Sequence, residues 1–430
     1  MSTDLSASSG RQGRFPGWSV VWGSFICLTT TSGLAFYGLA AYLNSLSKER
    51  GWSVGSISGA VAVFFLVGGI SGLVIAPMMA RYDVRRVMVG GAVIGAVALA
   101  LLGQVTSIWQ VYVIYAVFSV GHSAAGLIPA TTVVTRWFHT RRSTALSIAS
   151  TGLSMGGIAL TPFAKWALDE FGLSATTPWL AVVWLVGLVP FALLLIKPEP
   201  GPLGWLPDGV RAAPSSVPLV LGGVPYSVAS RTRFFVAITV AYVFVLGAQV
   251  GAIQQLVKLV EERTSAGTAT LATSVLAGTS VIARLVGGQV ASRVPMAMLA
   301  LSMAVLQACA LALLALASST AVLFGAIVLF GATIGNILML HPLLMGEAFG
   351  VKDYPRIFSR SQFFAFVGTA FGPYLLGWLH DNAGGYETSY LFAAGCSFVG
   401  ALALSRAGST AAAAAGTGWS GDSPATVSVP

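Results

Sequence analysis

The feature that most constrains this chain is a series of apolar segments, each long enough to cross a lipid bilayer. A transmembrane α-helix needs roughly 20 consecutive, mostly apolar residues. The segments that meet this length are 18–46, 54–80, 86–105, 108–135, 143–168, 177–196, 233–260, 268–291, 295–317, 320–349, 357–379 and 387–405. The sequence therefore predicts an all-α membrane protein with twelve transmembrane helices.

Composition supports the membrane assignment and argues against nucleic acid as a partner. The chain is 56% hydrophobic and 9% charged, whereas soluble domains carry about 25% charged residues. A surface so poor in charge suits the lipid bilayer as solvent. The net charge of +9 does not indicate nucleic-acid binding, because the basic residues form short clusters between apolar segments and not a stripe with interleaved aromatics.

The longest polar interruption divides the chain into two halves. Residues 197–232 contain seven prolines and scattered charge, which is typical of a linker. It separates a six-helix bundle at 18–196 from a second one at 233–405. The N-terminal tail, 1–17, is polar, and the tail at 406–430 is rich in Ala, Gly, Ser and Thr, so we expect that second tail to be disordered.

The positions of Lys and Arg predict the orientation. With both termini inside, 17 of the 23 lie in inside regions, five lie outside, and Arg284 remains within a helix. Positive charge is enriched on the cytoplasmic side of membrane proteins. We therefore expect both tails and the linker to be cytoplasmic in a multi-pass protein of a bacterial inner (cell) membrane.

No feature of the sequence indicates an enzyme. Each of the three cysteines, Cys27, Cys309 and Cys396, falls inside an apolar segment and is interpreted as a small buried residue rather than as part of a redox or metal site. The chain has no Gly-rich nucleotide loop, no His-Glu-x-x-His and no Gly-x-Ser-x-Gly motif. We expect no catalytic residue, no cofactor and no metal.

Two loops carry a family resemblance. Residues 76–86 read Ala-Pro-Met-Met-Ala-Arg-Tyr-Asp-Val-Arg-Arg, and residues 288–293 read Gly-Gln-Val-Ala-Ser-Arg. Both resemble the pattern Gly-x-Leu-Ala-Asp-Arg-x-Gly-Arg-Arg of the major facilitator superfamily, whose members are transporters built from two six-helix bundles. The family's aspartate is replaced by Ala80 and Ser292, so the latch that it provides must be weaker or built otherwise. The resemblance implies a conformational role for the remaining loop residues: Arg81, Asp83, Arg85, Arg86 and Arg293.

Four further features resemble one group within that superfamily, the monocarboxylate transporters and oxalate/formate exchangers. They are Gly51-Trp52-Ser53, Trp137-Phe138 followed by Arg141-Arg142, Arg284 followed by Gly287-Gly288, and Phe349-Gly350. The group's acidic residue at the start of the first helix is missing. Ser280 stands where animal members have an aspartate. The resemblance implies a small carboxylate as substrate, in the first place a monocarboxylate.

Arg284 is the most informative single residue. It lies nine residues before Arg293, or about 13 Å into the membrane at 1.5 Å per residue. An arginine at mid-membrane costs roughly 2.5–3.5 kcal/mol, so it should face a polar cavity or a partner. Its guanidinium matches a carboxylate with two parallel hydrogen bonds. We expect Arg284 to bind the substrate carboxylate; the alternative is a structural or snorkelling arginine.

Other polar residues within the apolar segments are weaker candidates. His122 and His341 can relay a proton near neutral pH, or simply hydrogen-bond neighbouring helices. His122 is also a candidate for substrate binding. The uncharged polar candidates for the lining of a substrate cavity are Tyr37, Gln254, Gln255 and Asn336.

Together these features predict a secondary active transporter that moves a small carboxylate by alternating access and functions as a monomer. Proton symport and carboxylate exchange are both open as coupling modes. An exporter of a lipophilic compound is the main alternative. A non-transporting receptor is less consistent with the sequence, because the linker and tails are too short to form a signalling domain.

Overall fold

The computed structural model describes residues 15–210 and 222–419. Most of the N-terminal tail, the middle of the linker and the end of the C-terminal tail lie outside the described residues. Within the described ranges the chain is helical, and β-pairing is limited to an isolated bridge between Gly223 and Gly350. The expected all-α fold is confirmed.

The first half forms six passages. Its elements are α1 (Gly17–Thr31), the π-helical turn η1 (Ser32–Phe36), α2 (Gly38–Arg50), α3 (Val54–Arg81), α4 (Val84–Leu102), α5 (Ile108–Ala125), α6 (Leu127–Trp137), α7 (Arg142–Met155), the π-helical turn η2 (Gly156–Leu160), α8 (Thr161–Phe171) and α9 (Leu173–Leu194). Three of the passages are composite. The first consists of α1, η1 and α2, the fourth consists of α5 and α6, and the fifth consists of α7, η2 and α8.

The second half consists of six long helices. They are α11 (Arg233–Arg263), α12 (Ala266–Val290), α13 (Met296–Leu316), α14 (Thr320–Phe349), α15 (Tyr354–Asn382) and α16 (Gly385–Ala407). Among the described residues, 11 passages are long and apolar enough to cross a membrane, and α15, 29 residues long, makes the twelfth. It packs along α11 and α3. The expected twelve helices are therefore present, with bounds that differ by a few residues.

Local chemistry sets the helix ends. α2 ends at Gly51, whose φ of 69° suits glycine, and α3 begins directly after Ser53, whose side chain accepts a hydrogen bond from the Ser56 amide. Thr232 and Ser319 cap α11 and α14 in the same way. These caps satisfy amide groups that a helix leaves unpaired at its N-terminus.

The connecting segments contain short helices. The linker has η3 (Gly201–Leu203), η4 (Pro207–Gly209) and α10 (Tyr226–Ala229), and α17 (Thr410–Gly416) follows α16. The tail that we expected to be disordered therefore contains a helix. Ser409 caps it by accepting from the Ala412 amide at 3.1 Å, and the run of alanines that follows has the highest helix propensity.

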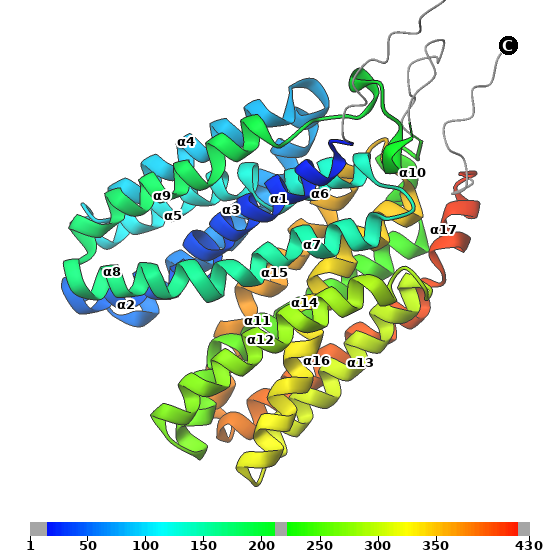
Figure 1. Cartoon of the computed structure of the whole chain (residues 1–430). Helices are drawn as coiled ribbons and strands as arrows, with labels where there is room; N and C mark the ends of the chain where they lie inside the picture. Colours follow the sequence, from blue (N-terminus) through cyan, green and yellow to red (C-terminus); the bar gives the residue numbers. More distant parts are fainter. Residues whose placement is uncertain (1–14, 211–221, 420–430) are drawn as a thin grey trace, which may run out of the picture.

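The two halves meet at one end and diverge at the other (Figure 1). They approach each other at the end where α10 and α17 lie, and their ribbons spread apart toward α2, α8 and the start of α12. α3 packs against α15 and α7 against α12. Close approach depends on glycine: a Cβ at Gly69 would lie 2.9 Å from the Phe363 ring, and one at Gly288 would lie 2.2 Å from Ser147. We call the end with α10 and α17 the closed end.

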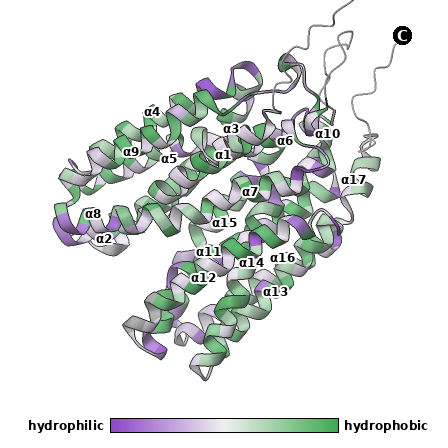
Figure 2. Ribbon diagram, in the orientation of Figure 1, coloured by the Kyte–Doolittle hydropathy of each residue, from purple (hydrophilic) through white to green (hydrophobic). Residues whose placement is uncertain are grey.

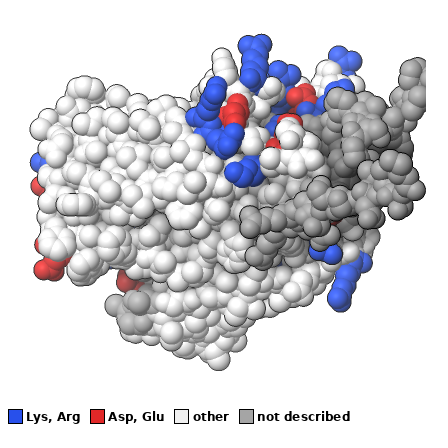
Figure 3. All heavy atoms as spheres, turned by 45° about the horizontal axis from the view of Figure 1, so that its top comes forward, with Lys and Arg blue, Asp and Glu red and all other residues white. Residues whose placement is uncertain are grey.

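The outside of the bundle is apolar, and the charges lie at its two ends. Large apolar side chains such as Trp109 and Met298 are more than 60% exposed, as a lipid-facing surface requires. Hydrophobic residues, coloured green, occur along all of the long helices (Figure 2). Lys and Arg gather at the closed end, whereas the opposite end shows mainly acidic residues (Figure 3). Of the described Lys and Arg, 14 lie at the closed end and five at the opposite end.

Candidate functional site

Arg284 lies where the two halves meet, close to the closed end. Its side chain is 1% exposed. Nε donates a hydrogen bond to the carbonyl oxygen of Gly335 on α14 at 3.0 Å, and Nη1 donates to the carbonyl oxygen of Ser150 on α7. The guanidinium therefore joins α7 of the first half to α12 and α14 of the second.

Of the two settings expected for Arg284, a polar cavity or a partner, the structure shows partners. Burying a guanidinium without partners costs several kcal/mol or more, and here backbone carbonyls supply the partners. Gly335 makes this possible, because a Cβ at that position would lie 2.9 Å from Cβ of Arg284 and 3.2 Å from its Nε. The glycine thus leaves room for the side chain that its carbonyl binds.

Small polar residues continue the contact between α7 and α12. The Ser147 hydroxyl donates to the Arg284 carbonyl at 2.6 Å, and the hydroxyls of Ser154 and Ser280 lie 3.4 Å apart. Residues three, four and seven apart share one face of a helix, so α7 presents its serines to α12 together. We call this set the α7–α12 interface: Ser147, Ser150 and Ser154 with Ser280, Arg284 and Gly288.

Tyr37 is brought close to Arg284 by two π-helical turns. η1 and η2 pack against each other so closely that a Cβ at Gly33 would lie 2.6 Å from the Gly156 carbonyl oxygen. Tyr37 follows η1 directly, covers Gly157, and lies within electrostatic range of Arg284. π-Helical turns occur frequently at functional sites, and Tyr37 stays half-buried.

Asn336 belongs to the same region. It follows Gly335, the residue whose carbonyl binds Arg284, and its Nδ2 donates to the Ala332 carbonyl at 2.9 Å. Its buried Oδ1 has no hydrogen-bond partner among the described residues. A Cβ at Gly287 would lie 1.6 Å from that oxygen, so Asn336 covers α12 one turn from Arg284. Three of the predicted residues, Arg284, Tyr37 and Asn336, therefore lie together.

The two histidines lie in different surroundings. His341 is buried, with Nε2 2.8 Å from the Ser361 hydroxyl and its ring stacked on Tyr242 at a centroid distance of 4.0 Å. That packing favours the structural interpretation of His341. His122 on α5 lies 5.4 Å from the Phe64 ring in the first half, and its buried Nδ1 has no hydrogen-bond partner in the described part of the chain.

The two glutamines lie in the half of α11 that is farther from the closed end. The Gln255 side chain accepts a hydrogen bond from the Tyr386 hydroxyl at 3.3 Å, whereas the Gln254 side chain is exposed. A Cβ at Gly377 on α15 would lie 3.1 Å from the Gln255 Nε2, so Gln255 faces α15 and α16. The structure does not bring them into the Arg284 cluster.

The loop residues that the family resemblance singles out make local contacts. Asp83 accepts hydrogen bonds from the amide and side chain of Arg85, with an ion-pair distance of 2.6 Å. The hydrogen-bonded Arg85 side chain lowers the pKa of the Asp83 carboxyl. Arg81, Arg86 and Arg293 are exposed. Across residues 15–210 and 222–419, no hydrogen bond or ion pair joins these loop residues to the opposite half.

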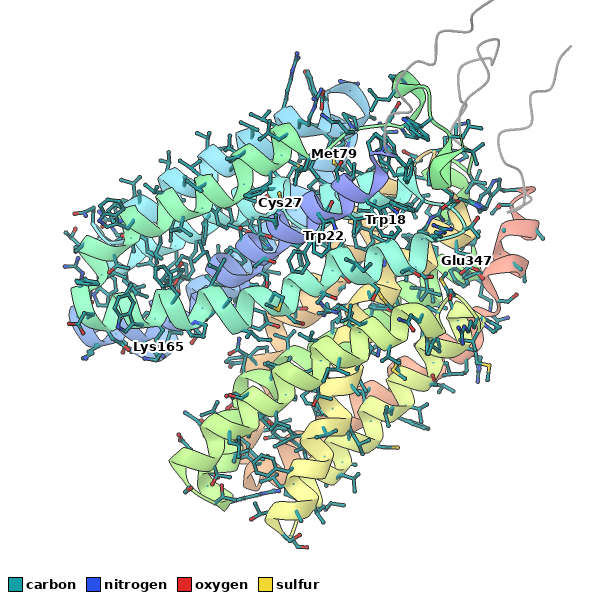
Figure 4. The ribbon with its side chains drawn as sticks, in the orientation of Figure 1. Trp18, Trp22, Cys27, Met79, Lys165 and Glu347 are labelled. Atoms are coloured by element: carbon teal, nitrogen blue, oxygen red, sulfur yellow. The ribbon has the colours of Figure 1, made fainter. Side chains whose placement is uncertain are left out.

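Arg142 provides a second contact between the halves, which the sequence reasoning missed. Its Nε donates to the Phe138 carbonyl at 3.1 Å, and its Nη1 donates to the Gly346 carbonyl on α14 at 3.0 Å. Glu347, the residue after Gly346, lies at the closed end, whereas Lys165 lies at the opposite end of the first half (Figure 4). The feature of the sequence that could have pointed to this contact is the pair Arg141-Arg142 after Trp137-Phe138.

The linker fastens the loops on both sides of that contact. Asp208 accepts hydrogen bonds from the backbone amides of His139, Thr140 and Arg141 at 3.1, 2.8 and 3.2 Å. In the second half, the Val224 amide donates to the Phe349 carbonyl at 3.0 Å. The described parts of the linker are therefore bound to the closed end rather than free of it.

Comparison with known proteins identifies the family. The model of the Major Facilitator Superfamily matches residues 25–340 and 252–421. The chain belongs to the Major Facilitator Superfamily. It is therefore a multi-pass integral membrane protein of a family of transporters, and the expected family is confirmed.

The curated relatives differ in what they carry. Monocarboxylate transporter 13 of Rattus norvegicus is 24% identical over 390 residues, covering 88% of this chain and 85% of that protein. The MFS-type transporter pynF of Aspergillus niger is 28% identical over 194 residues, 43% of either protein, and the fujikurins efflux protein of Gibberella fujikuroi is 26% identical over 222 residues, 48% of this chain. The matches to pynF and the fujikurins efflux protein span less than half of those proteins. These relatives are fungal and mammalian, so they give no support to the expected bacterial membrane.

Two solved transporters share the fold. The Escherichia coli fucose:proton symporter FucP aligns with a TM-score of 0.68 and 16% identity, over 92% of this chain and 100% of that one. The human organic anion transporter MFSD10 aligns with a TM-score of 0.64 and 15% identity, over the same shares. At these identities the likeness concerns the fold alone.

Proposed function

We propose that this superfamily member is a secondary active transporter for a small carboxylate, in the first place a monocarboxylate. The observation that carries the proposal is the position of Arg284, a buried guanidinium at the junction of the two halves with Tyr37 and Asn336 beside it. A guanidinium binds a carboxylate with two parallel hydrogen bonds. The match to monocarboxylate transporter 13 over most of the chain supports the same substrate class.

The arrangement of the two halves fits alternating access. They are joined at the closed end through Arg284 and Arg142 and diverge at the other end. With the basic closed end in the cytoplasm, as the charge distribution favours, this conformation is outward-facing. A substrate then enters from the outside, between the diverging ends of the halves, and moves toward Arg284 near the closed end.

Export of a lipophilic compound is the second candidate function. The relatives with the higher identities include a fujikurins efflux protein, and apolar helices form both bundles. An exporter of an uncharged compound has no use for a guanidinium at the junction of the halves. Dependence of transport on the charge and shape of Arg284 therefore distinguishes the two functions.

The proposal is tested by uptake of a panel of labelled carboxylates into proteoliposomes that contain Arg284 variants. We expect Arg284→Ala and Arg284→Gln to abolish transport and Arg284→Lys to reduce it strongly, because lysine keeps the charge but not the two-pronged geometry. Truncating one side of a buried charged pair costs about 2–5 kcal/mol, or roughly 30- to several-thousand-fold in affinity.

Arg263→Gln is the matched control. Arg263 donates to the carbonyls of Leu314 and Ala315 at 2.6 and 2.7 Å, so it also binds backbone carbonyls, but within the second half and far from Arg284. We expect this variant to transport normally. Unchanged apparent affinity for a carboxylate in Arg284→Gln would show that Arg284 is structural.

A further inference from the structure

We propose that Arg284 also holds the closed end shut, and that a bound carboxylate releases it by replacing the Ser150 carbonyl as partner of the guanidinium. The inference rests on the proposed function and adds how the substrate regulates the conformation. Binding and opening would then use the same side chain.

The side-chain contacts of Arg284 reach both halves of the molecule. Nη1 binds the Ser150 carbonyl on the first half, whereas Nε binds the Gly335 carbonyl on its own half. The backbone carbonyl of Arg284 accepts the Ser147 hydroxyl at 2.6 Å. Two of the three hydrogen bonds at the α7–α12 interface therefore involve atoms of Arg284 itself. The third joins Ser154 and Ser280 at 3.4 Å, a long distance for a pair of hydroxyls.

The guanidinium has two possible acceptors, the Ser150 carbonyl and a substrate carboxylate. A carboxylate carries a charge and forms stronger hydrogen bonds with guanidinium than a neutral carbonyl does. A buried guanidinium cannot lose the Ser150 carbonyl without a replacement, and the carboxylate provides one. The Ser150 carbonyl, once released, still faces the amide of residue 154 within α7. The exchange therefore leaves no buried group without a partner.

Tyr37 lies on the side from which a substrate would arrive. Tyr37 is half-buried, covers Gly157 just beyond the α7–α12 interface, and lies within electrostatic range of Arg284. Gly157 belongs to η2, on the side of α7 that leads toward the diverging ends of the halves (Figure 1). A carboxylate that enters between the diverging ends passes Tyr37 before it meets the guanidinium.

The test measures the width of the closed end with a pair of spin labels. Tyr82→Cys and Ser292→Cys place the labels on exposed loops of opposite halves, in a background in which Cys27, Cys309 and Cys396 are replaced by alanine. Distances are recorded by double electron–electron resonance in nanodiscs. The probes are acetate, pyruvate and benzoate, with acetamide and benzamide as uncharged controls.

We expect the unliganded protein to show mainly the short distance between the labels. Transported carboxylates should increase the population with the long distance, whereas the amides should not. Arg284→Gln should show the long distance without any ligand and should not respond to carboxylates. Its open-to-closed ratio should rise about 10- to 100-fold, which is the size expected for a lost hydrogen bond from a charged group. Arg263→Gln should behave like the parent protein.

A second variant keeps the test independent of the guanidinium. Ser147→Ala removes the hydroxyl that binds the Arg284 carbonyl, and we expect a smaller shift toward the long distance with the carboxylate response retained. Its control is Thr151→Val, because the Thr151 hydroxyl binds the Ser147 carbonyl within α7 at 2.8 Å. Unchanged distances in both Ser147→Ala and Arg284→Gln overturn the inference.

The outcomes separate the inference from the proposed function. If carboxylates are transported while Arg284→Gln keeps the short distance, the closing role fails and the function stands. If Arg284→Gln opens the closed end, but the parent protein neither transports a carboxylate nor opens its closed end when a carboxylate is added, the substrate assignment fails. Release of the closed end by a carboxylate then fails with it.

Discussion

At the scale of single residues, two buried arginines join the halves through backbone carbonyls. Arg284 binds Ser150, and Arg142 binds Gly346. In the described part of the chain, the ion pairs between side chains do not cross from one half to the other. The aspartate that the family resemblance led us to look for is replaced by Ala80, so the closed end is held by charged–neutral hydrogen bonds.

Arg142→Gln should loosen the closed end, because glutamine cannot reach both the Phe138 and the Gly346 carbonyls. We expect the open-to-closed ratio to rise about 10-fold or more, the equivalent of about 1.5–3 kcal/mol for a hydrogen bond from a charged group. The measurement is the rate at which a permeant maleimide modifies Ser359→Cys, a position that is 1% exposed on α15. The control is Arg141→Gln, whose side chain is exposed. Equal rates in the two variants would contradict a closing role for Arg142.

Only part of the candidate site could be predicted from the sequence, because the buried arginines bind backbone carbonyls. The cost of a buried charge singled out Arg284, and the structure places Asn336 against Gly287 near it and Tyr37 against Gly157, nearer the diverging ends. Arg142 entered the sequence analysis only as part of a family motif. Its contact between the halves could not be predicted, because its acceptors are backbone carbonyls, which every residue carries. Gln254 was included as a polar residue in an apolar run, yet its side chain is exposed away from the site.

At the scale of elements, apolar length predicted the helices but not their irregular turns. The segment predicted at 357–379 extends to Tyr354–Asn382, because hydropathy stops at charged residues whereas a helix continues past the membrane surface. The π-helical turns η1 and η2 left no signal, since one extra residue per turn hardly alters an apolar pattern. They matter because they place Tyr37 after η1 and pack Gly33 against Gly156.

Gly33→Ala should destabilise the first half. A Cβ at that position would lie 2.6 Å from the Gly156 carbonyl oxygen and 2.7 Å from the Leu160 side chain, and overpacking of this kind costs about 1–3 kcal/mol. The control is Gly90→Ala on α4, where nothing lies within 4 Å of the added Cβ and alanine favours the helix by up to about 1 kcal/mol. Thermal unfolding in detergent measures both. A melting temperature for Gly33→Ala at or above that of Gly90→Ala would show that η1 and η2 can separate without cost.

At the scale of the whole molecule, the charge at the two ends predicts the orientation in the membrane. The closed end carries 14 of the described Lys and Arg and should face the cytoplasm. An impermeant maleimide added to intact cells should therefore label Ala383→Cys at the far end of α15 and miss Val210→Cys in the linker, although both positions are exposed. Labelling of Val210→Cys alone would reverse the orientation and make the conformation inward-facing.

The coupling mode is also a property of the whole molecule, because it depends on which titratable groups both conformations can reach. Asp169, Glu170, Glu261 and Glu262 lie at the helix ends opposite the closed end, and Glu347 lies near the closed end. His341 is enclosed by Tyr242 and Ser361. His380, in the last turn of α15, is paired with Glu262 at the end opposite the closed end. Within the described spans this leaves His122, with an unpaired Nδ1, and the substrate's own carboxylate as carriers of a proton.

We therefore predict symport of a carboxylate with a proton, in which an inward pH gradient drives net accumulation in proteoliposomes. His122→Gln should weaken accumulation without abolishing carboxylate binding, because Arg284 remains, whereas His341→Gln should change stability more than coupling. Binding is measured separately, by the spin-label distances at the closed end. Carboxylate exchange predicts the opposite pattern, in which carboxylate trapped inside the vesicles stimulates uptake and a pH gradient drives no net accumulation. That pattern would rule out symport and leave alternating access intact. In an exchanger, the protein changes between its two conformations only while a carboxylate is bound at Arg284, and not while the site is empty.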